Sequence, residues 1–248
     1  MSLADRCIVI TGPGPGLGRA LSVALADAGA RVALLARGDA PETQAALRER
    51  GHEPFLVQAD VTDEAGVRAA MATVADRYGR IDGLVNNAAT FAGFTPLANI
   101  TLEMFDHTFA VNVRGAFLCA REAVPYMRAA GRGRIVNISS DTFYHAPAGM
   151  VAHVSAKGAL IGLTRALASE LGKDGITVNV VIPGLFASPR SRELAPAPVF
   201  EATRARQAQP DRNLEPEDLV GTFLFLLSDA AARTTGQSFL VNSGSVYQ

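Results

Sequence analysis

The chain has few cysteines, no excess of either charge and no long apolar run. Its two cysteines, Cys7 and Cys119, fall in apolar segments typical of buried positions, so no disulfide is expected. The 23 basic and 24 acidic residues do not cluster by sign, which argues against a nucleic-acid or membrane partner. The densest apolar stretch, 219–227, is far shorter than the ~18 residues of a membrane span. With no signal-peptide pattern at the start, we expect a reduced, cytoplasmic compartment.

No linker rich in proline, glycine or serine divides the sequence, so we expect a single domain over residues 1–248. Short apolar runs alternate with stretches of helical periodicity, which predicts an α/β fold with a parallel sheet covered on both faces. The predicted strands are 7–10, 31–36, 55–58, 83–86, 134–138, 177–182 and 239–242. The predicted helices are 17–28, 41–50, 63–78, 101–129, 151–172 and 216–228.

The segment 185–212 differs from the rest of the chain. It contains four prolines, Pro189, Pro196, Pro198 and Pro210, and its hydrophobic periodicity is weak. Irregular segments of this length in compact α/β domains usually serve as lids or binding loops. We therefore predict a loop that closes over a substrate.

A glycine-rich turn follows the first predicted strand. Gly12, Gly16 and Gly18 have the spacing G-x3-G-x-G within the segment 11–18, directly before a predicted helix. Glycines in this position permit a tight turn, a close approach of the backbone to phosphate and close packing of the helix on the sheet. Compared with an ordinary turn, the position between strand and helix favours a dinucleotide site.

From this turn onward the chain resembles the short-chain dehydrogenase/reductase family over essentially its whole length. Further motifs follow in the family's order: Asp60-Val61, Asn86-Asn87-Ala88-Ala89, Asn112, Asn137-Ile138-Ser139-Ser140, Ser155-Ala156-Lys157, Pro183-Gly184 and the segment 235–244. The resemblance implies a Rossmann fold, a doubly wound parallel sheet of about seven strands, and a nicotinamide-dependent oxidoreductase. The cofactor residues that it implies are Gly12, Gly14, Gly16, Leu17, Gly18, Arg37, Asp60, Val61, Asn87, Ala88, Lys157, Pro183, Gly184 and Ser188.

The end of the second strand bears on the choice of cofactor. Ala36 stands where NAD-binding relatives carry Asp, and Arg37 follows with a guanidinium that suits a 2′-phosphate. These residues favour NADP, with NAD as the alternative if Arg37 only faces solvent. Many NADP-binding relatives place Ser or Arg where this chain has Gly14 and Pro15. Asp60 either contacts the adenine or caps the next helix.

The family's catalytic set is Asn, Ser, Tyr and Lys, with Tyr four residues before Lys. Asn112, Ser140 and Lys157 fit the set, but the position of the tyrosine holds His153. An imidazole also transfers protons near neutral pH, and the charge of Lys157 should lower its pKa and keep it neutral. We therefore predict that His153 replaces the tyrosine as proton donor or acceptor.

Other hypotheses remain open at this stage. The chain could bind nucleotide without redox activity, or use His153 as the base of a lyase or isomerase. The phenol of Tyr144 could substitute for the missing tyrosine, although an aromatic pocket wall is the simpler interpretation. No acidic or sulfur ligand pattern accompanies His145 and His153, so no metal site is predicted.

The resemblance also suggests a pocket and an assembly. Its substrate pocket would contain Phe91, Phe94, Thr142, Tyr144 and Phe186, which predicts a small apolar or aromatic substrate. Helices 101–129 and 151–172 form the subunit interface in relatives, so we expect a homotetramer or homodimer. Their apolar residues, such as Phe117, Leu118, Leu160, Ile161 and Leu163, equally fit packing against the sheet.

Overall fold

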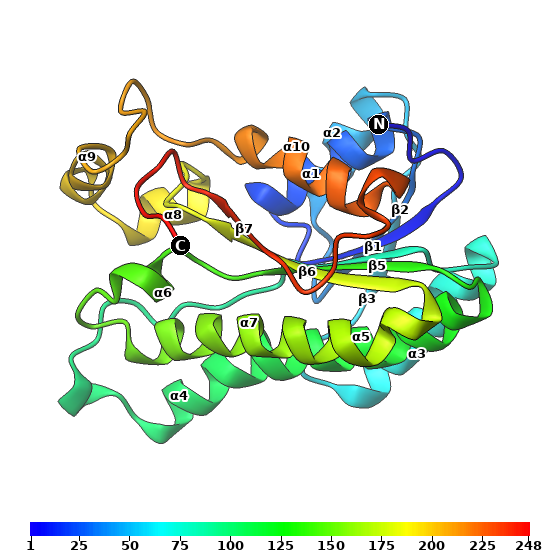
Figure 1. Ribbon diagram of the computed structural model, residues 1–248, viewed down its shortest axis with the longest axis horizontal. Helices are drawn as coiled ribbons and strands as arrows, with labels where there is room; N and C mark the ends of the chain where they lie inside the picture. The colour runs from blue at the N-terminus through cyan, green and yellow to red at the C-terminus, as the bar shows by residue number, and fades with distance from the viewer.

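The computed structural model describes residues 1–248 and contains a seven-stranded parallel sheet in the order β3-β2-β1-β4-β5-β6-β7, with helices on both faces (Figure 1). The strands are β1 (Cys7–Thr11), β2 (Arg31–Ala36), β3 (Phe55–Gln58), β4 (Gly83–Asn86), β5 (Gly133–Ile138), β6 (Ile176–Pro183) and β7 (Ser238–Val241). The α-helices are α1 (Leu17–Asp27), α2 (Pro41–Glu49), α3 (Glu64–Tyr78), α4 (Leu102–Phe109), α5 (Gly115–Ala129), α6 (Thr142–His145), α7 (Val151–Leu171), α8 (Pro189–Leu194), α9 (Ala197–Arg204) and α10 (Pro216–Leu227). A π-turn, η2 (Ala110–Arg114), joins α4 to α5, and short 3₁₀ turns are η1 (Leu97–Asn99), η3 (Gly172–Asp174) and η4 (Asp229–Ala231).

Two apolar cores lie on opposite faces of this sheet. Along β1, Ile8 and Ile10 face the core that is shared with α1 and α10, while Cys7 and Val9 face the core shared with α3, α5 and α7. This alternation follows from the period of two in a strand, and burial of both faces explains why the strands are continuous apolar runs. The predicted α/β fold with a parallel sheet is confirmed.

Cys7 and Cys119 are both buried as free thiols in the core that contains α3, α5 and α7. Burial raises the pKa of each thiol to about 12, so both remain protonated at neutral pH and act as small apolar side chains. None of the helices combines the length and the apolar character needed to cross a bilayer.

The predicted strands agree with the observed ones to within one residue at each end, and the predicted helix 101–129 is helical over residues 102–129. Within this helical stretch, η2 changes from α to π geometry, and no proline or glycine lies inside the turn. The predicted loop 185–212 contains α8 and α9, each with proline in its first turn. Proline suits a helix start because its missing N–H has no helical partner there.

The parallel order brings the carboxyl ends of the strands to one edge of the sheet. From β1 the chain builds β2 and β3 on one side and then returns to place β4 on the other side. Ligands of doubly wound folds bind at such a reversal. In this chain the reversal places the turns after β1 and β4 next to each other. The turns after β5 and β6 follow along the same edge.

Candidate active site

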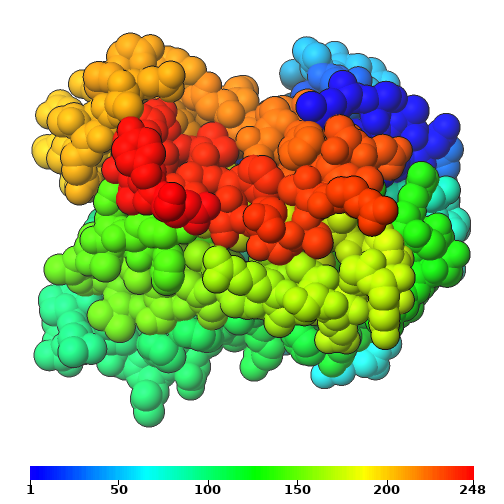
Figure 2. All heavy atoms as spheres, viewed as in Figure 1, coloured from blue at the N-terminus to red at the C-terminus, as the bar shows by residue number.

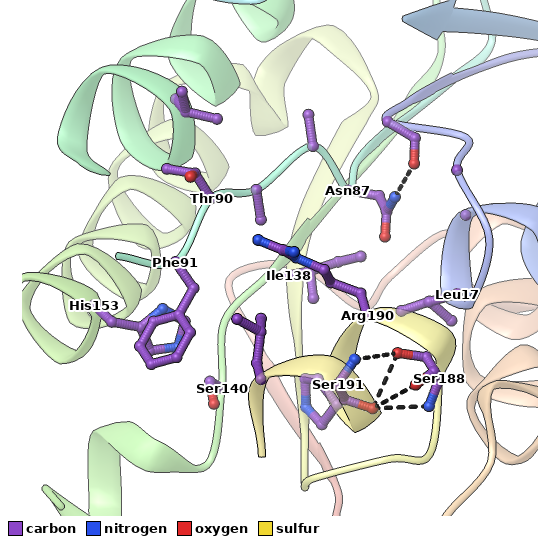
Figure 3. Close-up of a pocket in the computed structure, with 18 of the residues that line it drawn as sticks. Leu17, Asn87, Thr90, Phe91, Ile138, Ser140, His153, Ser188, Arg190 and Ser191 are labelled. Carbon is purple, nitrogen blue, oxygen red and sulfur yellow. Dashed lines mark hydrogen bonds between the residues drawn. The ribbon is translucent and has the colours of Figure 1, made fainter. Parts of the chain in front are cut away.

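A single large cavity opens along this carboxyl edge, with a volume of ≈ 1010 Å³. Segments that follow β1, β2, β3, β4, β5 and β6 contribute to its lining, together with α7 and the segment 185–206 (Figure 3). The volume lies at the upper end of the range of small-molecule sites. All predicted cofactor residues except Gly16 line this cavity.

The glycine turn is shaped by two positions at which a side chain has no room. Gly12 has φ +64°, and a Cβ there would lie 2.8 Å from the Cα of Ala88. A Cβ on Gly18 would overlap the carbonyl oxygen of Gly12. The amide of Asn87 donates to the carbonyl of Gly12 at 2.6 Å, and the hydroxyl of Thr11 accepts from the N–H groups of Asn87 and Ala88, both at 3.0 Å. These hydrogen bonds therefore hold the turns after β1 and β4 against each other.

Gly16 also contacts a segment that is distant in the sequence. It precedes α1 with φ +111°, and a Cβ there would lie 3.0 Å from the Cβ of Ser188. The absence of a side chain at Gly16 thus lets the start of α8 pack against the glycine turn. Ser188 itself caps α8, since its hydroxyl accepts from the N–H of Ser191 at 3.1 Å.

At the other end of the cavity, Arg37 and Asp60 lie near each other. The Arg37 side chain is 75% exposed, and its guanidinium lies 3.9 Å from the Asp60 carboxylate. Burial favours a higher pKa for Asp60, but hydrogen bonds from Thr62 and the charge of Arg37 outweigh it and hold the pKa below its ordinary value. Asp60 does not cap the next helix, because Asp63 does so by accepting from the N–H of Ala65.

Ser140 and Lys157 are positioned by three further hydrogen bonds. The ammonium of Lys157 donates to the carbonyl of Ile138 at 2.8 Å, and burial lowers its pKa to about 8. The hydroxyl of Ser139 donates to the carbonyl of Lys157 at 2.7 Å and is thereby used in the fold. The hydroxyl of Ser140 lines the cavity and accepts from the hydroxyl of Thr142 at 2.9 Å, which leaves its own proton for a ligand.

His153 projects from α7 and also lines the cavity. Figure 3 shows its ring beside that of Phe91, and the two rings meet edge to face with centroids 5.2 Å apart. Its Nδ1 is buried without a hydrogen-bond partner. Burial, and then the charge of Lys157, lower the pKa of His153 to about 3. The predicted direction of this shift agrees with the structure, but burial is the larger cause.

Two other predicted site residues lie outside the cavity lining. The side chain of Asn112 accepts from the N–H of Thr90 and donates to its carbonyl, both at 3.0 Å, so Asn112 holds the cavity segment at Thr90 while it is not itself part of the lining. The hydroxyl of Tyr144 donates to the side chain of Gln248 at 2.7 Å. The structure therefore contradicts a pocket position for Tyr144, whose phenol is turned toward the C-terminal residues, drawn red in Figure 2. The remaining predicted pocket residues, Phe91, Phe94, Thr142 and Phe186, line the cavity.

The structure adds charged residues to the site that the sequence analysis missed. Arg190 and Arg206 line the cavity from the segment 185–212, and His145 and Asp141 line it from the turn after β5. Asp141 is buried, accepts from the hydroxyl of Ser245 at 2.9 Å and has its pKa raised by burial. No motif marks these positions, since isolated arginines in an irregular segment resemble solvated surface residues.

Comparison with known proteins places the chain in a family. Residues 13–245 match the family model described as enoyl-(acyl carrier protein) reductase. A probable galactose dehydrogenase of Rhizobium meliloti (strain 1021) is 38% identical over 250 residues, which cover 98% of this chain and 95% of that protein. An inactive 2-(S)-hydroxypropyl-CoM dehydrogenase 2 of Xanthobacter autotrophicus (strain ATCC BAA-1158 / Py2) is 42% identical over 221 residues, 88% and 95% of the two chains. The crystal structure of levodione reductase superposes with a TM-score of 0.89 at 31% identity, over 97% of each chain. The chain therefore belongs to the short-chain dehydrogenase/reductase family, whose members are oxidoreductases that generally use NAD(P).

Proposed function

We propose that the protein is an NADP(H)-dependent oxidoreductase that interconverts a carbonyl and an alcohol on a small, apolar or aromatic substrate. The observation that carries this proposal is the meeting of the glycine turn with Ser140, His153 and Lys157 on one cavity. The aromatic rings of Phe91, Phe94 and Phe186 supply an apolar wall beside these polar groups.

The residues present fit a dinucleotide. The N-terminus of α1 has no side-chain cap, so its N–H groups are available to a diphosphate, and Gly12 and Gly18 keep the approach free of side chains. At the adenosine end, Ala36 offers no carboxylate to the ribose, while the exposed guanidinium of Arg37 suits a 2′-phosphate. These features support NADP over NAD. The oxidised cofactor, when bound, would supply the acceptor for a hydride.

In alcohol oxidation, Ser140 donates a hydrogen bond to the substrate oxygen, and His153 takes the proton of the substrate hydroxyl as the carbon–hydrogen bond breaks. The pKa of about 3 for His153 describes a site without an anionic substrate oxygen. Negative charge that develops on that oxygen favours the protonated imidazole and offsets the cost of burial. Lys157 supplies positive charge beside the cavity, and in this proposal it would bind the nicotinamide ribose.

A second candidate is a nucleotide-binding protein without redox turnover. The buried, unpartnered Nδ1 of His153 and its low pKa favour this alternative, because neither helps a proton to enter or leave the ring. One relative at 42% identity is itself named inactive. A lyase or isomerase that uses His153 as its base is the third candidate, and it too would bind the dinucleotide without consuming it.

Turnover assays separate these candidates. The assay follows nicotinamide absorbance with NADPH or NADP⁺ against ketones, aldehydes and alcohols. It compares the wild-type protein with His153→Ala, His153→Tyr and the control His52→Ala. We expect turnover by the wild type and the control, a preference for NADPH over NADH, and a loss of about 100-fold or more in kcat for His153→Ala. Tight NADPH binding without turnover, together with activity gained by His153→Tyr, would instead establish the second candidate.

We also propose a homodimer or homotetramer assembled through α4, α5 and α7. Of the apolar residues on these helices, Leu118, Leu160 and Ile161 are buried within the chain's own fold. Phe117 on α5, Leu102 on α4 and Val151 on α7 are instead exposed large apolar side chains. These three residues support an interface on that layer of the molecule.

A further inference from the structure

The side chain of Arg190 lines the cavity from the surface helix α8 and is itself exposed. Figure 3 shows the guanidinium extending from α8 toward the side of the cavity where Asn87 and Thr90 lie. A dinucleotide that spans the cavity from Arg37 to His153 must pass through this region. The guanidinium of Arg190 therefore either repositions or contacts the cofactor when the cofactor binds.

The glycine turn offers a diphosphate no side-chain partner of its own. Residues 12–18 are glycine, proline and leucine, with no cation and no hydroxyl. Among the cavity's other cations, Arg37 lies at the end beside Asp60, and Lys157 is buried with its ammonium on the carbonyl of Ile138. Arg206 lines the cavity from the segment after α9, and its charge acts on Asp141 in the turn after β5. The two negative charges of a diphosphate would thus meet backbone dipoles alone, unless a side chain from outside the turn approaches.

The backbone of α8 is fixed next to this turn. Ser188 packs directly against Gly16, and the reciprocal bonds between Ser188 and Ser191 hold the first turn of the helix. Arg190 lies within that first turn, two residues after Ser188. Its long side chain therefore starts beside the N-terminus of α1, which is where a diphosphate would sit.

The ion pair that Arg190 makes in this structure is weak enough for a ligand to replace it. The guanidinium lies 3.1 Å from the carboxylate of Glu193, and the two side chains are 66% and 64% exposed. Exposed ion pairs of this kind contribute little to stability because water screens them. A diphosphate, with more charge and more acceptor oxygens, would compete effectively for the guanidinium.

We propose that Arg190 is a mobile clamp that leaves Glu193 and binds the diphosphate of the incoming dinucleotide. This inference rests on the proposed function, since it assumes that a dinucleotide occupies the cavity. It assigns to the segment 185–212 a direct part in cofactor binding, in addition to covering the substrate.

Calorimetry with nucleotide fragments tests the clamp. ADP carries the diphosphate without a 2′-phosphate, 2′-AMP carries the 2′-phosphate without a diphosphate, and adenosine carries neither. We expect Arg190→Gln to weaken ADP binding about tenfold at low salt, as for loss of one charge-assisted hydrogen bond, and to leave 2′-AMP unchanged. Arg37→Gln should show the reverse pattern.

Arg192→Gln is the matched control. Arg192 lies on the same helix, is 64% exposed and pairs with Glu215 at 3.9 Å, but it does not line the cavity. We expect no change in ADP affinity from this substitution. Glu193→Gln provides a test of opposite sign, because removing the competing carboxylate should tighten ADP binding severalfold.

The outcomes separate the clamp from the function on which it rests. If the wild type binds ADP and NADPH but Arg190→Gln behaves like Arg192→Gln, the clamp is wrong and the proposed function stands. An equal loss for ADP and 2′-AMP in Arg190→Gln would indicate damage to the fold and also overturn the clamp. If the wild type binds neither NADPH nor NADH, the proposed function fails and the clamp fails with it.

Discussion

The burial of His153 links its titration to the stability of the fold. In the folded protein its pKa is about 3, whereas an imidazole in an unfolded chain titrates near ~6.5. Below pH ~6.5 the unfolded chain takes up a proton that the folded protein does not. The free energy of unfolding therefore has its full value above pH ~6.5, and this His153-linked part of it is lost progressively as the pH falls toward 3. At about pH 5 the loss is on the order of 1–2 kcal/mol.

Urea unfolding at about pH 7.5 and about pH 5 measures this effect. His153→Gln cannot titrate, so the difference in unfolding free energy between the two pH values should shrink by on the order of 1–2 kcal/mol. His107→Gln, at an exposed histidine, should leave the difference nearly unchanged. If both variants respond to pH as the wild type does, His153 is not held neutral by its surroundings.

The sequence predicted part of the set of side chains that meet at the site, but it missed Arg190, Arg206 and Asp141 and did not show how each residue is used. The resemblance to the family's catalytic motif indicated Ser140, His153 and Lys157, and all three line one cavity. The spacing of the motifs could not show that the side chain of Asn112 is hydrogen-bonded to the backbone of Thr90. Nor could it show that the hydroxyl of Tyr144 donates to the side chain of Gln248. Both outcomes depend on contacts between segments far apart in the chain, which no local pattern records.

Gly14 and Gly18 both belong to the glycine-rich segment at the start of α1, but the space around them differs. At Gly18 a methyl group would overlap the carbonyl of Gly12 and lie 2.9 Å from the Cα of Pro13, so the backbone must shift. At Gly14 nothing lies within 4 Å of the same position, and its φ is not positive. Alanine would therefore meet backbone atoms at Gly18 and open space at Gly14, so the same substitution tests the two environments.

We expect Gly18→Ala to lower the free energy of unfolding by about 2 kcal/mol through overpacking, and to weaken NADPH binding more than tenfold. Gly14→Ala should stay within about 0.5 kcal/mol of wild type and keep its affinity. Thermal unfolding and NADPH titration of the two variants measure both effects. Equal behaviour of the two alanine variants would contradict the close contact between Gly18 and Gly12.

Regular elements were predictable where periodicity and caps agreed. The strands are apolar runs bounded by turn residues, and Pro41 and Pro216 mark helix starts correctly. The short helices α8 and α9 were missed because six and eight residues carry too little periodicity to distinguish a helix from a loop. The π-turn η2 was missed because it preserves the helical pattern of the sequence on either side.

At the level of the whole chain, the sheet order explains why motifs from separate segments share one cavity. All the strands are parallel, so every connection that begins at a carboxyl end contributes to the same edge. The two helical layers differ in exposure. On the layer that contains α4, α5 and α7, Leu102 is 82% exposed and Phe117 and Val151 are each 41% exposed. Burial of these side chains against a second copy would remove apolar surface from water.

The proposed assembly can be tested through Phe117. A glutamate at this position would place a charge in the interface, and a symmetric interface would bring two such charges close together. We expect Phe117→Glu to lower the molar mass measured by light scattering after gel filtration. Because Phe117 is partly exposed within its own chain, the monomer should still fold, as far-UV circular dichroism would show. Tyr247→Glu, at a 76% exposed aromatic residue near the C-terminus, is the control and should keep the wild-type mass. An unchanged mass for folded Phe117→Glu would exclude an assembly that depends on this residue.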